Sequence, residues 1–339
     1  MNFLAEFQKY GNEKKKLNNF IINYIENSDN CEANFSHLIE FININKYQEN
    51  REELSHLLHL IVNIADNHNR DEHFMMKIEQ ILQYLKDQIK QSFSNLEIYN
   101  LFQSNKIILL YLIKNKIIVI DEEIFYLITS KINGTQFCHF FYPEIKNLNF
   151  ESEKVDEIEK EIISVNSNIF ENYEDNRIKG VNESYICSLI RQDSIIEFVS
   201  YVNRQNVSLE SQINHSIFET NSFLIENQPT LIEYAAFYGS IQIFQYLRLN
   251  NVELPSSLWL YAIHSKNAEL IHLLEENNVD PPNKSYDQCL IESIKCHHND
   301  IANYFKGNYD IKDNEEILSS VYQFHNYFYF PIEMKNDFD

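Results

Sequence analysis

The chain of 339 residues carries 28 Lys and Arg against 50 Asp and Glu, which gives a formal net charge of −22 at pH 7. Nucleic acids and anionic membrane surfaces need a basic footprint, so this charge argues against both as partners. The most apolar stretch, residues 106–120, is interrupted at residues 114–116, well short of the roughly 20 apolar residues of a membrane span. We therefore expect a globular protein without membrane insertion.

The first half of the sequence has the spacing of amphipathic helices. Apolar residues recur at i, i+3, i+4 and i+7 within residues 52–67 and again within residues 71–90. Ser94 followed by Glu97 has the pattern of a capping box, and Asp121 is placed to cap the next helix. We expect residues 1–150 to form a helical region of unknown function.

Residues 151–184 are more charged, with an excess of acidic side chains. Val155, Ile158, Ile162 and Ile163 predict one amphipathic helix, followed by a linker. We place a boundary between two regions of the chain in this segment.

The second half contains an internal repeat. The stretch LIEYAAFYGSIQIFQYLRLNNVEL aligns with LWLYAIHSKNAELIHLLEENNVDP at an offset of about 27 residues. Weaker copies occupy residues 289–311 and 185–207. Each copy predicts a short helix, a tight turn at Gly239 or its equivalents Lys266 and His297, and a second helix. One such unit cannot bury its own apolar face, so we expect the units to stack.

The repeat resembles the ankyrin repeat. The residues at matching positions are Thr230, Ile232, Ala235, Ala236, Gly239, Ile243 and Leu247. The Pro and His of the family's T-P-L-H stretch are missing, and Asn251 and Asn278 replace its helix-ending glycine. Asn is the next-best residue for the left-handed backbone needed there. Together with the helical first half, the chain is similar to degenerate, Asn- and Ile-rich ankyrin families of parasitic protists such as trichomonads.

The resemblance implies an all-α fold, in which about four repeats over residues 185–312 form a solenoid after the helical region. It also implies a concave binding face lined by the first helices. The candidate partner-binding residues are Tyr234, Phe237, Tyr238, Tyr261, His264, Ser265, Glu292 and Lys295, with Cys296 beside them. Packing of these residues against the long insertion 208–228 is the alternative at each position.

Two sets of residues are of the types found in metal sites or in catalytic sites. Cys289, Cys296, His297 and His298 are zinc-ligand types, but their C-x6-C-H-H spacing is not a usual zinc pattern, so a structural role is favoured. His264 and Glu292 offer a histidine and an acid without a discernible nucleophile. Nucleotide-binding and hydrolase motifs are missing from the sequence. We expect no enzyme activity, no metal or cofactor and no small-molecule substrate.

The stretch 321–334 is rich in aromatic residues. We expect it to belong to a cap, residues 313–339, that covers the last repeat, with a short partner-binding motif as the alternative. Five scattered cysteines without a CxxC motif favour a reducing compartment, the cytoplasm or else the nucleus. The expected function is a non-catalytic scaffold or adaptor that binds a protein partner of unknown identity through its concave face and connector tips. The alternatives are an effector or regulatory module in the N-terminal half targeted by the repeats, and a self-associating structural protein.

Overall fold

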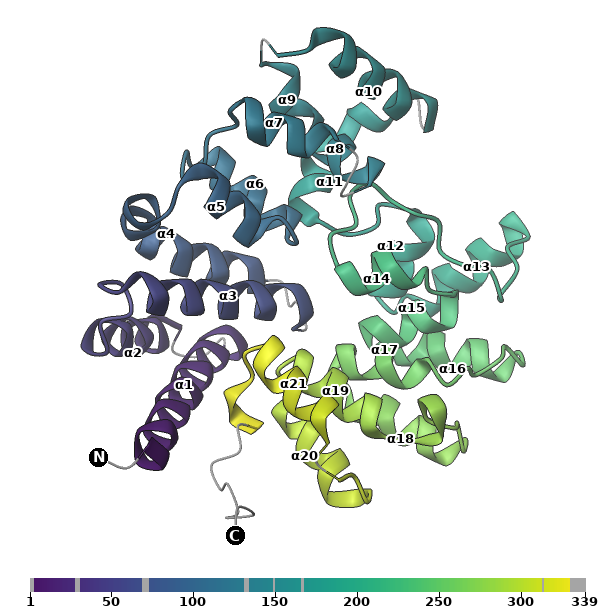
Figure 1. Cartoon of the computed structure of the whole chain (residues 1–339). Helices are drawn as coiled ribbons and strands as arrows, with labels where there is room; N and C mark the ends of the chain where they lie inside the picture. The colour runs from purple at the N-terminus through teal and green to yellow at the C-terminus, as the bar shows by residue number, and fades with distance from the viewer. Residues whose placement is uncertain are drawn as a thin grey trace. The chain divides into compact units, whose positions relative to one another are not determined.

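A computed structural model describes residues 3–27, 31–68, 73–130, 134–148, 150–165, 168–312 and 314–329. Within these ranges the regular structure is helical, apart from an isolated antiparallel bridge between Gln212 and Thr230 (Figure 1). The expectation of an all-α protein is confirmed. None of the helices in this part of the chain is both long and apolar enough to cross a membrane.

The chain divides into two compact units. The terminal unit combines Met1–Gln83 with Ala235–Asp339, and the central unit is Tyr84–Tyr234. The divisions fall within α4 (Phe74–Ser92) and α15 (Leu231–Tyr238). They differ from the ranges 1–150, 151–184, 185–312 and 313–339 because the first helices bond to segments that are far away in the sequence.

The terminal unit begins with α1 (Phe3–Glu26), α2 (Cys31–Ile44) and α3 (Arg51–Asn67). Periodic apolar residues explain why α3 and α4 form, because each helix can bury one stripe. The expected stripes are confirmed, since the following residues are all buried: Leu54, Leu57, Leu58, Ile61 and Ile64 in α3, and Phe74, Ile78, Ile81, Leu82, Leu85 and Ile89 in α4.

The helices in the second part of the terminal unit are, in chain order, α16 (Ile241–Leu249), α17 (Leu258–Ser265), α18 (Ala268–Glu276), η2 (Pro282–Lys284), α19 (Asp287–Lys295), α20 (Asn299–Asn308), α21 (Glu315–Gln323) and η3 (Tyr327–Tyr329). The predicted second helices α16, α18 and α20 alternate with the first helices α17 and α19, and α21 and η3 follow. The first helix α19 contacts α17 and α21. Ile317, Val321 and Tyr327 complete the apolar core formed by Leu290 and Ile294 of α19, which is the location expected of a cap; residues 330–334 of the aromatic stretch lie outside the described ranges.

The central unit consists of shorter helices. They are α5 (Asn95–Phe102), α6 (Lys106–Lys114), α7 (Glu122–Thr129), α8 (Thr135–Phe140), α9 (Tyr142–Lys146), α10 (Ser152–Val165), η1 (Ile169–Asn172), α11 (Tyr173–Lys179), α12 (Tyr185–Arg191), α13 (Ile195–Gln205) and α14 (Ser222–Asn227). Both predicted caps are confirmed. Ser94 and Glu97 form a capping box, and the Asp121 side chain accepts a hydrogen bond from the backbone N–H of Ile124 at 3.0 Å.

The acidic segment contains more structure than its sequence indicates. Helix α10 forms as predicted, with Val155, Ile158 and Ile162 buried, whereas Ile163 is exposed. Within the part of the segment expected to be a linker, residues 169–179 form η1 and α11. A long-range ion pair anchors α11: the buried Arg177 guanidinium donates to Glu144 at 2.7 Å. This bond spans 33 positions, so no local pattern reveals it.

One turn geometry recurs between the paired helices. Its central residue has a left-handed backbone, with φ between +49° and +69°, at Asp193, Gly239, Lys266, His297 and His325. In four of these turns the next N–H bonds to the carbonyl five residues earlier, as in Ser240 to Ala235 at 2.9 Å and His298 to Ser293 at 3.0 Å. This pattern closes a helix end and reverses the chain. Gly239 therefore lies in the tight turn that the sequence predicts.

The second helices end in an equally regular way. Asn206, Asn251 and Asn278 all have a left-handed backbone, and the N–H of the following valine bonds back to the helix at 2.9 to 3.2 Å. Asn tolerates this conformation because its short polar side chain can bond locally. The predicted left-handed backbone of Asn251 and Asn278 is confirmed.

Candidate functional site

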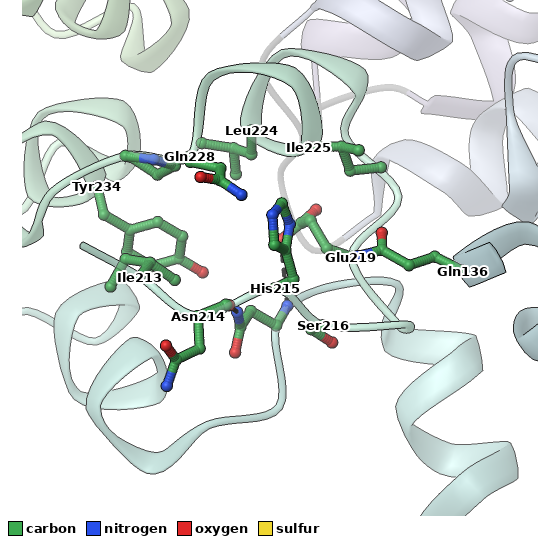
Figure 2. A pocket seen from close by; sticks show the side chains of 12 residues that line it. Gln136, Ile213, Asn214, His215, Ser216, Glu219, Leu224, Ile225, Gln228 and Tyr234 are labelled. Carbon is green, nitrogen blue, oxygen red and sulfur yellow. Dashed lines mark hydrogen bonds between the residues drawn. The ribbon is translucent and has the colours of Figure 1, made fainter. Parts of the chain in front are cut away.

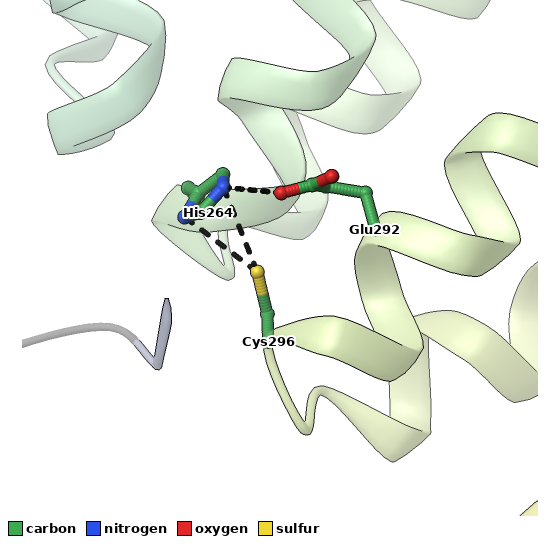
Figure 3. A group of neighbouring side chains, drawn as sticks. All are labelled: His264, Glu292 and Cys296. Carbon is green, nitrogen blue, oxygen red and sulfur yellow. Dashed lines mark hydrogen bonds and ion pairs between the residues drawn. The ribbon is translucent and has the colours of Figure 1, made fainter. Parts of the chain in front are cut away.

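The first helix of each copy can be numbered backwards from its left-handed turn residue. In this numbering, His264 of α17 occupies position −2, Glu292 of α19 occupies position −5, and Cys296, the C-cap residue of α19, occupies position −1. Glu292 and Cys296 are four residues apart, so they project from the same face of α19. Figure 3 shows both side chains directed at His264.

These three side chains form a compact group that we call the inner cluster. His264 Nε2 donates a hydrogen bond to Glu292 Oε1 at 2.7 Å. Cys296 Sγ lies 3.5 Å from His264 Nδ1 and 3.7 Å from Nε2. Lys295 Nζ lies 3.1 Å from the same carboxylate oxygen. The potential ligand atoms of the inner cluster all lie within 4.8 Å of one another.

Burial governs the protonation of the inner cluster. All three residues are buried, Cys296 completely. Burial, and then the charge of Glu292, raises the pKa of the Cys296 thiol well above its usual range. Burial alone would also raise the pKa of Glu292, but hydrogen bonds and charge from His264 and Lys295 outweigh it and lower that pKa. The cluster therefore contains a carboxylate and a neutral thiol.

The inner cluster has the residue types of a cysteine nucleophile, a base and an orienting acid. A nucleophile must be a thiolate and must be reachable by substrate. Cys296 is 0% exposed and its pKa is raised, so the cluster meets neither requirement in this conformation. Binding of a metal ion requires neither an open cleft nor a preformed thiolate.

In the central unit, different residues make a contact between the same two positions, −2 of one copy and −5 of the next. Arg191 occupies position −2 before Asp193, and Tyr234 occupies position −5 before Gly239. Arg191 Nη1 donates to the Tyr234 hydroxyl at 2.8 Å. Positions −2 and −5 of successive copies thus meet in both units, by Arg–Tyr in one and by His–Glu in the other.

The structure buries most of the predicted partner-binding residues. Tyr234, Tyr261, His264, Ser265 and Glu292 are buried. A side chain that is packed inside cannot contact a partner without a rearrangement. The remaining predicted residues, Phe237, Tyr238 and Lys295, are partly exposed.

Phe237 and Lys295 lie against the inner cluster. The Phe237 ring stacks on the His264 ring at a centroid distance of 5.2 Å, and Lys295 pairs with Glu292. Both residues therefore border the cluster while keeping part of their surface in solvent.

The four Cys and His residues singled out in the sequence do not come together as one group. His298 Nδ1 donates to the carbonyl of Ile263, and His297 Nε2 donates to the carbonyl of Phe324, both at 2.9 Å. These two histidines thus bond to the backbone of adjacent copies. Cys296 instead joins His264 and Glu292, a grouping that depends on how α17 and α19 pack and that an alignment of the copies does not give.

Helix α1 bonds to three of the left-handed turns of the terminal unit, those at Lys266, His297 and His325. Asn18 of α1 lies 3.2 Å from His297 Nδ1 and donates to the carbonyl of His325 at 3.0 Å. Glu26, at the end of α1, pairs with Lys266. Although burial alone would raise the pKa of Glu26, hydrogen bonds from His68 and Lys266 lower it to about 2. Each of the three turns is thus bonded to α1.

Histidines gather where α3 meets the last of these turns. His59 stacks on His325 at 5.9 Å, and His56 lies 6.1 Å from the same ring. Burial, followed by the charges of His59 and His56, lowers the pKa of His325 to about 4. Burial also lowers the pKa of His56 and His59. We call His56, His59 and His325 the histidine seam.

The central unit contains a small cavity beside the insertion 208–228 (Figure 2). Ile213, His215, Glu219 and Tyr234 are among the residues that line it. Its volume of about 20 Å³ has room for about one water molecule, far less than a metabolite needs. Glu219 accepts hydrogen bonds from the backbone N–H groups of Thr220 and Asn221, both at 2.9 Å. We interpret the cavity as part of the packing of the insertion.

No family model, curated protein or solved structure matches this chain.

Proposed function

We propose that the chain is a non-catalytic, protein-binding protein whose residues 185–312 form about four degenerate ankyrin-like repeats. The observation that supports this most is the recurring left-handed turn at Asp193, Gly239, Lys266 and His297. A unit repeated in register presents equivalent positions again and again, and repeat proteins bind other proteins through such surfaces. The five cysteines are free thiols, which favours the cytoplasm.

The proposed contact surface in the terminal unit is the rim of the inner cluster, formed by Phe237, Tyr238 and Lys295. The Phe237 and Tyr238 rings lie edge to face at 5.1 Å, and Phe237 rests on the buried His264 ring. Aromatic side chains supported by a packed layer are common binding hot spots. The net charge of −22 favours a partner with a basic surface, because complementary charge accelerates association.

A pull-down from native cells with quantitative mass spectrometry tests this proposal. We expect Phe237→Ala/Tyr238→Ala to lose most of the partner that the unchanged protein recovers. The matched control is Leu249→Ala, which alters a side chain on the second helix α16 that is 71% exposed. Equal recovery by the double variant and the unchanged protein would rule out this surface.

A further inference from the structure

We propose that His264, Glu292 and Cys296 bind one zinc ion, which joins the repeat copies α17–α18 and α19–α20. The three ligands lie beneath the proposed contact surface, and the zinc proposal does not rest on protein binding there. It unites imidazole, carboxylate and thiol, three ligand types that zinc accepts in a single tetrahedral site. All three come from the packed pair α17 and α19, which are in direct contact.

The distances within the inner cluster suit a tetrahedral ion. Zinc bonds of about 2.3 Å to sulfur and about 2.05 Å to nitrogen place those two ligand atoms about 3.6 Å apart. The distances between Cys296 Sγ and the His264 ring nitrogens are 3.5 and 3.7 Å. The corresponding nitrogen–oxygen separation is about 3.4 Å, whereas His264 Nε2 and Glu292 Oε1 are 2.7 Å apart. Glu292 must therefore withdraw by several tenths of an ångström, which its flexible side chain allows.

Charge and protons balance on binding. Zinc binds His264 Nε2 in place of the proton shared with Glu292, and that proton moves to Nδ1, so the imidazole stays neutral. The Cys296 thiol proton is released to solvent. The resulting thiolate and the Glu292 carboxylate supply two negative charges to the dication. The site then has no net charge, which suits a buried location. Lys295, which pairs with Glu292, is released from neutralising that carboxylate.

The ligand set favours zinc over the hard cations. Magnesium and calcium prefer oxygen ligands, whereas a thiolate with an imidazole suits zinc. Three protein ligands leave the fourth tetrahedral position to a water molecule, and Glu292, whose side chain is 12% exposed, borders solvent. The Phe237 ring stacked on His264 restrains the imidazole, as the surroundings of a metal site commonly do.

A hydrogen bond that only joins two neighbouring copies does not need a thiol beside it. In the central unit Arg191 and Tyr234 make the same register contact, and the residue at position −1 beside Tyr234 is Tyr238, whose hydroxyl is no zinc ligand of the usual kind. In the terminal unit, position −1 beside Glu292 is Cys296. The thiol is the feature that converts a hydrogen-bonded pair into a set of three metal ligands.

Cobalt titration of the purified full-length chain tests the proposal. The protein is stripped with a chelator and titrated with Co²⁺, which reports thiolate ligation by a charge-transfer band and tetrahedral geometry by visible bands. We expect saturation at one ion per chain and loss of the bands when Zn²⁺ is added. Cys296→Ser should abolish the charge-transfer band. The control Cys31→Ser/Cys289→Ser, which removes the other two thiols of the terminal unit, should retain it.

A second measurement keeps the test valid if a variant is unstable. Thermal unfolding is followed with Zn²⁺ and with chelator, using circular dichroism to confirm that each variant is folded. Zn²⁺ should raise the melting temperature of the unchanged chain and of Cys31→Ser/Cys289→Ser, but not of His264→Gln. Folded, unchanged protein that gives no band, or a band that survives in Cys296→Ser, overturns the proposal.

Discussion

Arg191 and Tyr234 connect two successive copies in the central unit through one hydrogen bond, whereas His264, Glu292 and Cys296 connect two copies in the terminal unit through buried ionisable groups. The register that brings these positions together is the same in both places. In the first pair Arg191 is only partly buried, while in the second the buried Glu292 carboxylate depends on its bonds to His264 and Lys295. The repeat thus decides which residues meet, and their chemistry decides what the contact can do.

Removing the histidine of the inner cluster should have the largest effect. Removing a hydrogen-bond partner of a buried charged group costs about 3 kcal/mol. We expect His264→Ala to destabilise the terminal unit by about that amount, because it leaves Lys295 as the partner of the Glu292 carboxylate. Urea unfolding in chelator can be followed by the fluorescence of Trp259, the single tryptophan, which is buried in α17. The control is His272→Ala, because His272 pairs with Glu275 while 58% exposed. Similar losses in both variants would contradict a special role for the inner cluster.

Acid should weaken the terminal unit through the histidine seam. The pKa of His325 is lowered to about 4 and those of His56 and His59 are also lowered, so the folded state binds fewer protons than the unfolded state below about pH 6.5. The contribution of the seam to stability should therefore fall as the pH drops through 6.5 and level off near pH 4, while His297, whose pKa burial lowers to about 3, continues the loss below that pH. The other charged group facing His325 is Lys14, which also disfavours its protonation.

His325→Asn is the matched variant for this pH dependence, since Asn tolerates the left-handed backbone at this position. Its urea midpoint, again from Trp259 fluorescence, should depend less on pH than that of the unchanged chain. An unaltered slope between pH 6.5 and 4 would show that the seam is not responsible.

The central-unit contact should contribute less than the inner cluster. Tyr234→Phe removes only the hydroxyl that accepts from Arg191, and Arg191 retains its bond to the carbonyl of Asn182 at 2.8 Å. We expect a loss of about 1.5 kcal/mol, at the lower end for hydrogen bonds to charged groups. Circular dichroism of urea unfolding measures it, and a loss as large as that of His264→Ala would erase the contrast between the two contacts.

The turn at Gly239 should show the smallest effect. Its φ is +69°, but an added Cβ would meet nothing closer than Asn267 Nδ2 at 3.4 Å, which is ordinary contact. The cost of Gly239→Ala is therefore backbone strain of about 1 kcal/mol. Gly239→Asn should cost less, because Asn accepts this conformation more readily. A thermal melt in which both variants equal the unchanged chain would show that the turn is not under strain.

Local signals predicted much of the fold. The apolar stripes of α3 and α4, the caps at Ser94 and Asp121, and the left-handed Asn251 and Asn278 all depend on residues within about one helix. The compact units could not be predicted in the same way. They depend on bonds such as Asn18 to His297, which join positions 279 residues apart and leave no periodic trace.

The candidate site was predictable only in part. Aligning the copies identifies His264 and Glu292 as first-helix residues, yet it does not show that position −2 of one copy meets position −5 of the next. The same limitation led to the expectation that Tyr234 and Tyr261 face a partner, whereas both are buried. Burial depends on neighbouring helices, which a single-repeat pattern does not describe.

Cross-linking mass spectrometry of the chain with its captured partner tests the protein-binding proposal most directly. Lys295 lies at the rim of the inner cluster, while Lys284 and Lys306 are exposed elsewhere on the terminal unit, in η2 and in the second helix α20. We predict that cross-links to the partner concentrate at Lys295 and decrease in Phe237→Ala/Tyr238→Ala. Cross-links confined to Lys284 and Lys306, unchanged in that variant, would contradict binding at this surface.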